Sequence, residues 1–106
     1  MLPKKERLSR QEFNRFFSLG KRTHSPSFQV IYTQYESLHV SVVVSKKIAK
    51  SAVKRNVIRR RMYDIVRRYR SETKMSGVFI FIVKPPVLGA PYEGLKDEVR
   101  GYLGKI

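Results

Sequence analysis

The sequence predicts an α+β fold in which helices pack on a small mixed β-sheet. Apolar residues recur at helical spacing in three segments, alternate in two segments between residues 27 and 45, and run without interruption from 78 to 83. The expected order is therefore helix, strand, strand, helix, strand, helix. A length of 106 residues suits one domain that covers residues 1–106.

The composition is that of a globular protein with a large positive charge. Hydrophobic residues make up 42% of the chain, enough to bury a core and to argue against wholesale disorder. The 23 Lys and Arg against 8 Asp and Glu give a net charge of +15, which favours a polyanionic partner. Since the sequence shows no membrane span and no apolar signal segment, we expect a soluble, cytoplasmic protein.

The first helix is predicted to begin at Ser9. Ser9 and Glu12 have the spacing of a capping box, and Leu8 and Phe13 stand at the two positions of a hydrophobic staple. Gly20 is placed to end this helix in the left-handed conformation.

Two alternating segments follow, at 27–35 and 38–45, and each is typical of a strand. Because two residues link them tightly, we expect them to pair as a hairpin. The apolar side chains that share one face of the first segment are Phe28, Val30 and Tyr32.

Residues 78–83 are predicted to form a buried central strand, since they are apolar without alternation and rich in β-branched side chains. The two prolines after Lys84 end this strand, because proline has no backbone N–H and restricts the residue before it. A last helix is expected after Pro91, with apolar residues on one side. These are Leu95, Val99, Tyr102 and Leu103.

Two thirds of the excess charge lies in residues 46–70, which hold 11 basic side chains and 1 acidic one, a net +10. Residues 52–70 are predicted to form an amphipathic helix, because Ile58, Met62, Ile65, Val66 and Tyr69 fall into one stripe. The remaining arc is basic, and Asp64 alone cannot neutralise it through pairs four residues apart. This pattern favours nucleic-acid binding over a merely solvated surface. The basic residues are Lys54, Arg59, Arg60, Arg61, Arg67, Arg68 and Arg70.

The sequence offers no pattern for catalysis by protein groups. His24 and His39 stand alone, and the carboxylates lack the spacing of a Mg²⁺ or Zn²⁺ site. With no cysteine, disulfides, thiolate metal sites and a cysteine nucleophile are excluded. We therefore predict neither catalytic residues nor a metal site in the protein.

Several motifs resemble the protein subunit of bacterial ribonuclease P, over almost the whole chain. They are R-L followed by E-F-x-x-x-F (Arg7, Leu8, Glu12, Phe13, Phe17), V-S-K-K at 44–47, A-V-x-R-N-x-I-x-R-R at 52–61, and Y-E-x-L from Tyr92. The specific feature is S-K-K followed within about ten residues by R-N-x-I-x-R-R.

The resemblance implies a two-layer α-β-β-β-α-β-α sandwich, similar to a ribosomal-protein fold. It adds a short strand near Lys21–His24 and an unusual left-handed β-α-β crossover around the basic helix. It also implies an endoribonuclease whose RNA subunit, with Mg²⁺, removes the 5′ leader of precursor tRNA. The protein would be a non-catalytic subunit, monomeric in the ribonucleoprotein, with ribonuclease P RNA and precursor tRNA as partners, no membrane, and Mg²⁺ bound mainly by the RNA.

The same resemblance implies two sets of binding residues. The set for the catalytic RNA is Lys46, Lys47, Lys54, Arg55, Asn56, Arg59, Arg60 and Arg61. The set for the leader, in a cleft between the first helix and the sheet, is Phe13, Phe17, Phe28, Val30 and Tyr32. The chain departs from the usual R-N-R at Val57, and we expect Arg61, about 40° away around the helix, to replace the missing arginine. Tyr63 also stands where many relatives have a basic residue.

The cleft is expected to contain at least one exposed ring. Phe16 and Phe17 point about 100° apart on a helix, so a short helix on a small sheet cannot bury both. RNA bases stack on such rings with little sequence preference, which suits a leader of variable sequence.

Three other functions compete with this interpretation. A structural RNA-binding protein of ribosomal type explains the charge, size and sheet equally well, but it does not require an aromatic cleft. A module that lies on a membrane surface is less favoured, because the apolar stripe of the basic helix is needed for a core. A nuclease that acts alone is the least favoured, since the sequence lacks a constellation of carboxylates.

Overall fold

The computed structural model describes residues 8–105, so Arg7 of the first motif lies outside the described residues. The elements are α1 (Arg10–Leu19), β1 (Lys21–His24), β2 (Phe28–Thr33), β3 (Leu38–Val43), α2 (Ala52–Glu72), β4 (Gly77–Val83), the 3₁₀ helix η2 (Pro85–Gly89) and α3 (Tyr92–Leu103). The α+β class is confirmed, as is the extra strand over Lys21–His24.

The four strands form one mixed sheet in the order β1-β2-β4-β3. β2 pairs antiparallel with β1 and β4, while β3 pairs parallel with β4. The predicted hairpin between the second and third strands is therefore wrong, whereas the central place of β4 is confirmed. β4 is apolar on both faces and gains most from a position between two strands. Residues 34–37 are long enough to carry the chain past it, because neighbouring strands are about 4.8 Å apart.

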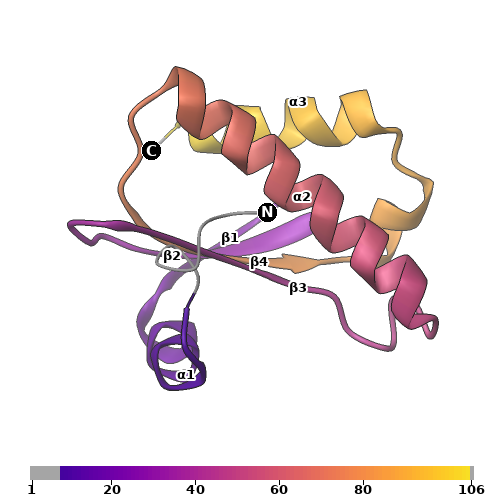
Figure 1. The fold of residues 1–106 in the computed structure, drawn as a ribbon, viewed down its shortest axis with the longest axis horizontal. Helices are drawn as coiled ribbons and strands as arrows, with labels where there is room; N and C mark the ends of the chain where they lie inside the picture. The colour runs from indigo at the N-terminus through magenta and orange to yellow at the C-terminus, as the bar shows by residue number, and fades with distance from the viewer. Residues whose placement is uncertain (1–7, 106) are drawn as a thin grey trace.

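The connection from β3 through α2 to β4 joins two parallel neighbours of the sheet. In Figure 1, β3 runs in front of β4 and α2 passes above both, so that the path turns in the left-handed sense. This is the hand that the resemblance implies and the opposite of the usual rule for such connections.

Helices lie on both faces of the sheet. α2 and α3 cover one face, and α1 lies on the other (Figure 1). The sheet together with α2 and α3 forms the expected two-layer sandwich. α1 adds a partial third layer on the opposite face of the sheet. On the α2 side the core includes Phe28, Val30, Phe79 and Phe81, and on the α1 side Phe16 packs with residues of β2 and β4.

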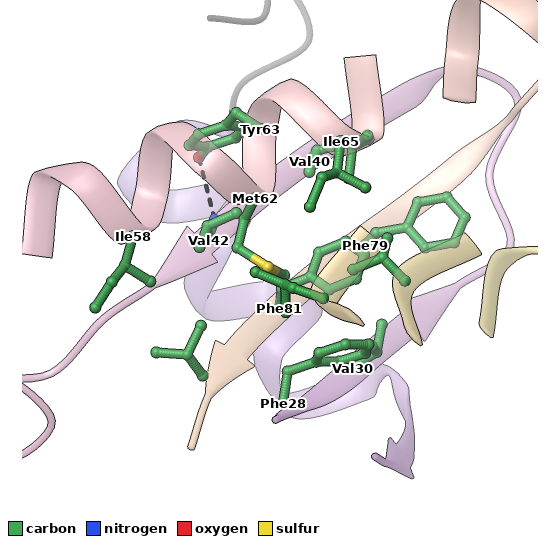
Figure 2. Packing of buried hydrophobic residues seen from close by; sticks show 14 of the residues in the cluster. Phe28, Val30, Val40, Val42, Ile58, Met62, Tyr63, Ile65, Phe79 and Phe81 are labelled. Carbon is green, nitrogen blue, oxygen red and sulfur yellow. Dashed lines mark hydrogen bonds between the residues drawn. The ribbon is translucent and has the colours of Figure 1, made fainter. Parts of the chain in front are cut away.

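The apolar stripe of α2 is confirmed as a core-facing surface. Ile58, Met62, Ile65 and Val66 are buried against the sheet, as Figure 2 shows for the first three. Burial of each such side chain contributes about 1.5–3 kcal/mol to folding. This packing holds a helix whose many cations would otherwise repel one another.

The start of α1 is as predicted and its end is not. The Ser9 backbone N–H donates to Glu12 Oε1 at 3.1 Å, and the Glu12 N–H donates to Ser9 Oγ at 3.2 Å, which completes the capping box. Gly20 is extended, with φ −73° and ψ 156°, so the predicted left-handed end is wrong. A glycine is needed there for space, because a Cβ would overlap the Ile31 Cγ2 methyl group.

Gly77→Ala is expected to destabilise the protein. Gly77 has φ +111°, and a Cβ would lie 2.6 Å from Tyr32 Cε1, so strain and overlap both arise where β4 begins. We expect a loss of about 2–3 kcal/mol in the free energy of unfolding by urea. Gly101→Ala in α3 is the control, since a Cβ there meets nothing within 4 Å, and it should stabilise by up to about 1 kcal/mol. Equal stability of Gly77→Ala and the wild type would contradict this account.

Candidate nucleic-acid interface

The loop before α2 places two predicted lysines on the surface. The chain turns at Ser45, whose carbonyl accepts the Ile48 N–H at 3.1 Å and the Ala49 N–H at 3.4 Å. Lys46 and Lys47 are exposed in this turn. Four residues, 48–51, separate them from the first residue of α2.

Arg55 has a different position from the rest of the predicted set. Its Nη1 donates to the carbonyl of Ala49 at 2.9 Å and to that of Lys50 at 2.8 Å. The half-buried Arg55 side chain thus fastens the loop to the start of α2. Its main structural effect is to hold residues 49 and 50 against the start of α2.

The other predicted residues of α2 lie on two sides of the helix. At about 100° per residue, Asn56 and Arg60 are about 40° apart, and Lys54 and Arg61 are about 20° apart. Arg60 and Arg61 differ by about 100°, so the two pairs face different directions. The predicted set is therefore divided between two neighbouring surfaces rather than gathered in one.

A groove of about 820 Å³ follows α2 on the side of Asn56 and Arg60. Its three arginines outnumber its single aspartate, which gives it a positive charge. Arg67 was not among the predicted contacts. It lies two helical turns after Arg60 and therefore on the same side of α2, a spacing that could have identified it from the sequence. The described residues that line the groove are Asn56, Arg59, Arg60, Tyr63, Asp64 and Arg67.

Tyr63 joins the groove to the edge of the sheet. Its Oη accepts the backbone N–H of Val42 at 3.1 Å, as Figure 2 shows. Val42 belongs to β3, an edge strand whose outward N–H groups have no strand partner within residues 8–105. Tyr63 is thus buried and satisfies an edge donor.

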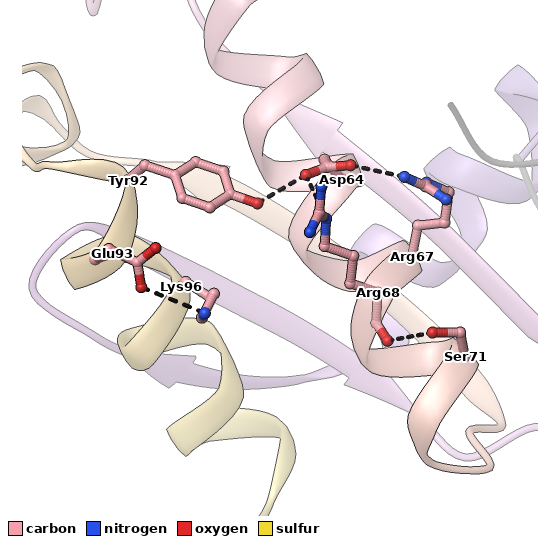
Figure 3. A network of polar contacts seen from close by, with 7 residues as sticks. All are labelled: Asp64, Arg67, Arg68, Ser71, Tyr92, Glu93 and Lys96. Carbon is pink, nitrogen blue, oxygen red and sulfur yellow. Dashed lines mark hydrogen bonds and ion pairs between the residues drawn. The ribbon is translucent and has the colours of Figure 1, made fainter.

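Asp64 organises the outer part of the groove, as Figure 3 shows. Its carboxylate accepts from Tyr92 Oη at 2.7 Å, from Arg67 Nη2 at 2.9 Å and from Arg68 Nε at 3.0 Å. The hydrogen bond from Tyr92 is the main cause that lowers the pKa of Asp64 below its usual value, and the hydrogen bond from Arg67 is the second. The bond between Tyr92 and Asp64 also raises the pKa of Tyr92. The network ties α3 to α2 and restrains two arginines.

The opposite side of the molecule carries the aromatic residues of α1. Phe16 is buried, whereas Phe13 and Phe17 are half-buried, with their ring centroids 5.7 Å apart. The expectation that Phe16 and Phe17 cannot both be buried is confirmed. The Arg22 guanidinium lies over the Phe17 ring at 4.9 Å from its centroid, a cation–π contact from β1.

The predicted position of Phe28, Val30 and Tyr32 in the α1 cleft is wrong. Phe28 and Val30 are fully buried in the core under α2 and α3, and Tyr32 packs on Phe79 in the same layer. Alternation along β2 correctly groups these three side chains on one face. It does not say which helix covers that face, and that helix is not α1.

The sheet surface beside α1 is formed by the alternate residues of the strands, whose side chains point away from α2 and α3. Ile31 is buried under α1, and Gln29, Ile82 and Val43 form a row of half-buried residues across β2, β4 and β3. We call Phe13, Phe17, Gln29, Val43 and Ile82 the α1-side surface. It mixes partly exposed rings, aliphatic groups and an amide.

Within residues 8–105, no group of three or more His, Cys, Asp or Glu is placed to hold a metal ion. His24 Nδ1 lies 3.3 Å from Lys84 Nζ, and His39 Nε2 lies 2.9 Å from Ser37 Oγ. Each histidine therefore has a local polar neighbour. None of the helices in this part of the chain is long and apolar enough to cross a membrane.

Comparisons with known proteins agree on one family. The family model described as Ribonuclease P matches residues 2–106. The ribonuclease P protein component of a Nitratiruptor species is 30% identical over 98 residues, which cover 92% of this chain and 88% of that protein. The same component of a Thermoanaerobacter species is 33% identical over 97 residues, 89% of this chain and 82% of that protein.

Solved structures show the same fold. The RNase P protein from Thermotoga maritima has a TM-score of 0.82 at 21% identity, over 95% of this chain and 97% of that one. The Staphylococcus aureus RNase P protein has a TM-score of 0.81 at 20% identity, over 93% of both chains.

Asp64→Asn is expected to destabilise the protein in a manner that depends on pH. A carboxyl group whose pKa is lowered by folding stabilises the folded state above its unfolded pKa, and this contribution is lost as the pH falls through the folded value. Urea unfolding should show a loss of about 1 kcal/mol near neutral pH. The loss should shrink below the ordinary carboxyl pKa of 3.8. Glu93→Gln, which removes an exposed pair with Lys96, is the control with little expected effect. A loss that is independent of pH would refute the role given to the Asp64 charge.

Proposed function

Because this chain belongs to the ribonuclease P protein family, we propose that it assists an RNA subunit in removing the 5′ leader of precursor tRNA. The catalytic RNA binds the basic surfaces of α2 and the loop before it. The leader binds the α1-side surface. The protein is a monomeric, non-catalytic subunit of a cytoplasmic ribonucleoprotein endonuclease.

The observation that carries the proposal is the separation of two chemically different surfaces by one sheet. Figure 1 shows α2 on one side of the sheet and α1 on the other. The cations belong to α2, and the half-buried rings belong to α1. A protein with this arrangement can contact a structured RNA and a flexible strand at the same time. Each surface also suits its ligand in chemistry.

The α2 side suits a folded RNA because its contacts are cationic and one of them, Arg67, is held in place by Asp64. Arg59, Arg60 and Arg67 line a groove, and Asp64 restrains Arg67 with a hydrogen bond of 2.9 Å. Guanidinium groups bind phosphate through two parallel hydrogen bonds, and restraint reduces the entropy lost on binding. Lys46 and Lys47 extend the positive surface beyond the start of α2.

The α1-side surface suits a single strand of variable sequence. Bases can stack on the free parts of Phe13 and Phe17, at about 1–3 kcal/mol per base. Arg22, which lies over Phe17, supplies a positive charge for the backbone of the strand. Ile82 and Val43 offer an apolar floor, and Gln29 offers an amide beside it.

The proposal gives the bond-breaking step and the Mg²⁺ mainly to the RNA subunit. The carboxylates of the chain lack the spacing of a Mg²⁺ site, while its cations and rings serve binding and orientation. The protein therefore acts by positioning two RNA molecules relative to each other.

A structural RNA-binding protein of ribosomal type is the second candidate. It would use the same cations of α2, but it gives no role to the half-buried Phe13 and Phe17. The two candidates therefore differ in the function of α1.

Reconstitution tests the proposed function directly. We expect the protein, mixed with a bacterial ribonuclease P RNA and precursor tRNA at near-physiological Mg²⁺, to make cleavage at the 5′ end efficient. The RNA alone and the protein alone are the controls. Cleavage that is the same with and without the protein would favour the structural candidate, whereas cleavage by the protein alone would contradict the assignment of the chemistry to RNA.

Phe17→Ala should weaken binding of precursor tRNA to the reconstituted enzyme by about tenfold, since one stacking contact is lost. Binding of mature tRNA, which lacks a leader, should hardly change. Leu19→Ala is the matched control on the same helix, because Leu19 is 67% exposed and lies outside the α1-side surface. Equal losses for precursor and mature tRNA would indicate a folding defect and count against a leader contact.

A further inference from the structure

Two valines stand exposed on the most basic helix of the protein. Val53 is 73% exposed and Val57 is 40% exposed, both in the first half of α2. They are four residues apart and so lie on the same side of the helix, about 40° from each other. This side points away from the core stripe that contains Met62. The pair therefore contributes little to the packing of α2.

Cations flank the valine pair on both sides. Measured from the line midway between the valines, Arg60 lies about 40° to one side, and Arg61 and Lys54 lie about 60–80° to the other. All three are exposed in the structure. The outer face of α2 thus has an apolar centre between two charged margins. We call Val53 and Val57 the valine strip.

We propose that the valine strip lies over the shallow minor groove of a double-helical segment of the catalytic RNA. Ribose and base edges form the floor of such a groove, and phosphates form its two rims. The valines contact the floor, and the cations on either side contact the rims. This inference rests on the proposed function and assigns the form of RNA that α2 contacts.

The charge of the chain disfavours two other occupants. A second copy would bring another +15 against the same face, and the cations beside the strip would repel it. A lipid surface needs a broad apolar face, whereas here only two valines lie between charged margins on this face of α2. An A-form RNA duplex supplies both the negative rims and an accessible floor.

The valine strip and the cations should affect binding in different ways. Apolar contacts contribute affinity without releasing counterions, so their loss leaves the salt dependence unchanged. Loss of one phosphate contact reduces the slope of log K against log salt concentration by about 0.7–0.9. The two contributions can therefore be measured separately in one titration series.

The test uses the full chain with Val53 and Val57 both changed to Ser, and ribonuclease P RNA as the ligand. We expect about tenfold weaker binding with the salt slope unchanged. Arg61→Ala is the comparison and should lower the slope. The urea midpoint of the double variant should equal that of the wild type, because both valines are exposed. Wild-type affinity of the double variant, or a lower slope for it, would overturn the inference.

Duplex ligands identify the groove. A fully paired RNA duplex should bind the double variant less tightly than the wild type, whereas a DNA duplex of the same sequence should bind both equally, because its narrow minor groove does not admit a helix. Equal losses of affinity for both duplexes would overturn the assignment to the RNA groove. A double variant that binds phosphatidylserine vesicles less tightly than the wild type, but binds both duplexes as the wild type does, would also overturn it. Failure of the wild type to bind ribonuclease P RNA more tightly than unrelated RNA would instead refute the proposed function.

Discussion

The burial of β4 on both faces is the constraint on which the rest of the structure depends. Phe79 and Phe81 face α2 and α3, while Val78 and Ile80 face α1. A strand with this composition is stable only between two strands and beneath cover on both sides. The need to cover two faces sends α1 and α2 to opposite sides of the sheet, and this separates the aromatic surface from the cationic one.

The same core holds α2 in spite of its charge. Clustered cations repel one another, and that repulsion opposes folding. The buried stripe from Ile58 to Val66 offsets it, and Asp64 and Glu72 connect the helix to Tyr92 and Arg100 of α3. Because α2 is held from its inner side and along one flank, cations such as Lys54, Arg60 and Arg61 remain exposed for a ligand.

The sequence predicts where the helices and strands lie, but it predicts less well which strands pair and which helix covers each face of the sheet. Periodicity located α1, α2, α3 and the three longer strands, since a side-chain pattern is a local property, whereas the short β1 was expected only from the family resemblance. It could not show that β4 lies between β2 and β3, or that Phe28 and Val30 face α2, because pairing and cover are settled by distant segments. Arg55 and Arg59 lie four residues apart on one helix, so the sequence alone gives them the same role. The structure distinguishes Arg55, because its side chain donates to the carbonyls of Ala49 and Lys50.

The changed assignment of the β2 residues alters what the α1-side surface can recognise. Phe28, Val30 and Tyr32 would have made an apolar trough. The observed row of Gln29, Ile82 and Val43 instead mixes an amide with aliphatic groups. Arg22 covers one face of the Phe17 ring, so a base must approach that ring from its uncovered part or stack on Phe13. A strand bound there would meet a cation, aromatic rings and an aliphatic floor. Stacking on the rings and packing on the aliphatic floor do not read the hydrogen-bonding edge of a base, and this indifference suits a ligand of variable sequence.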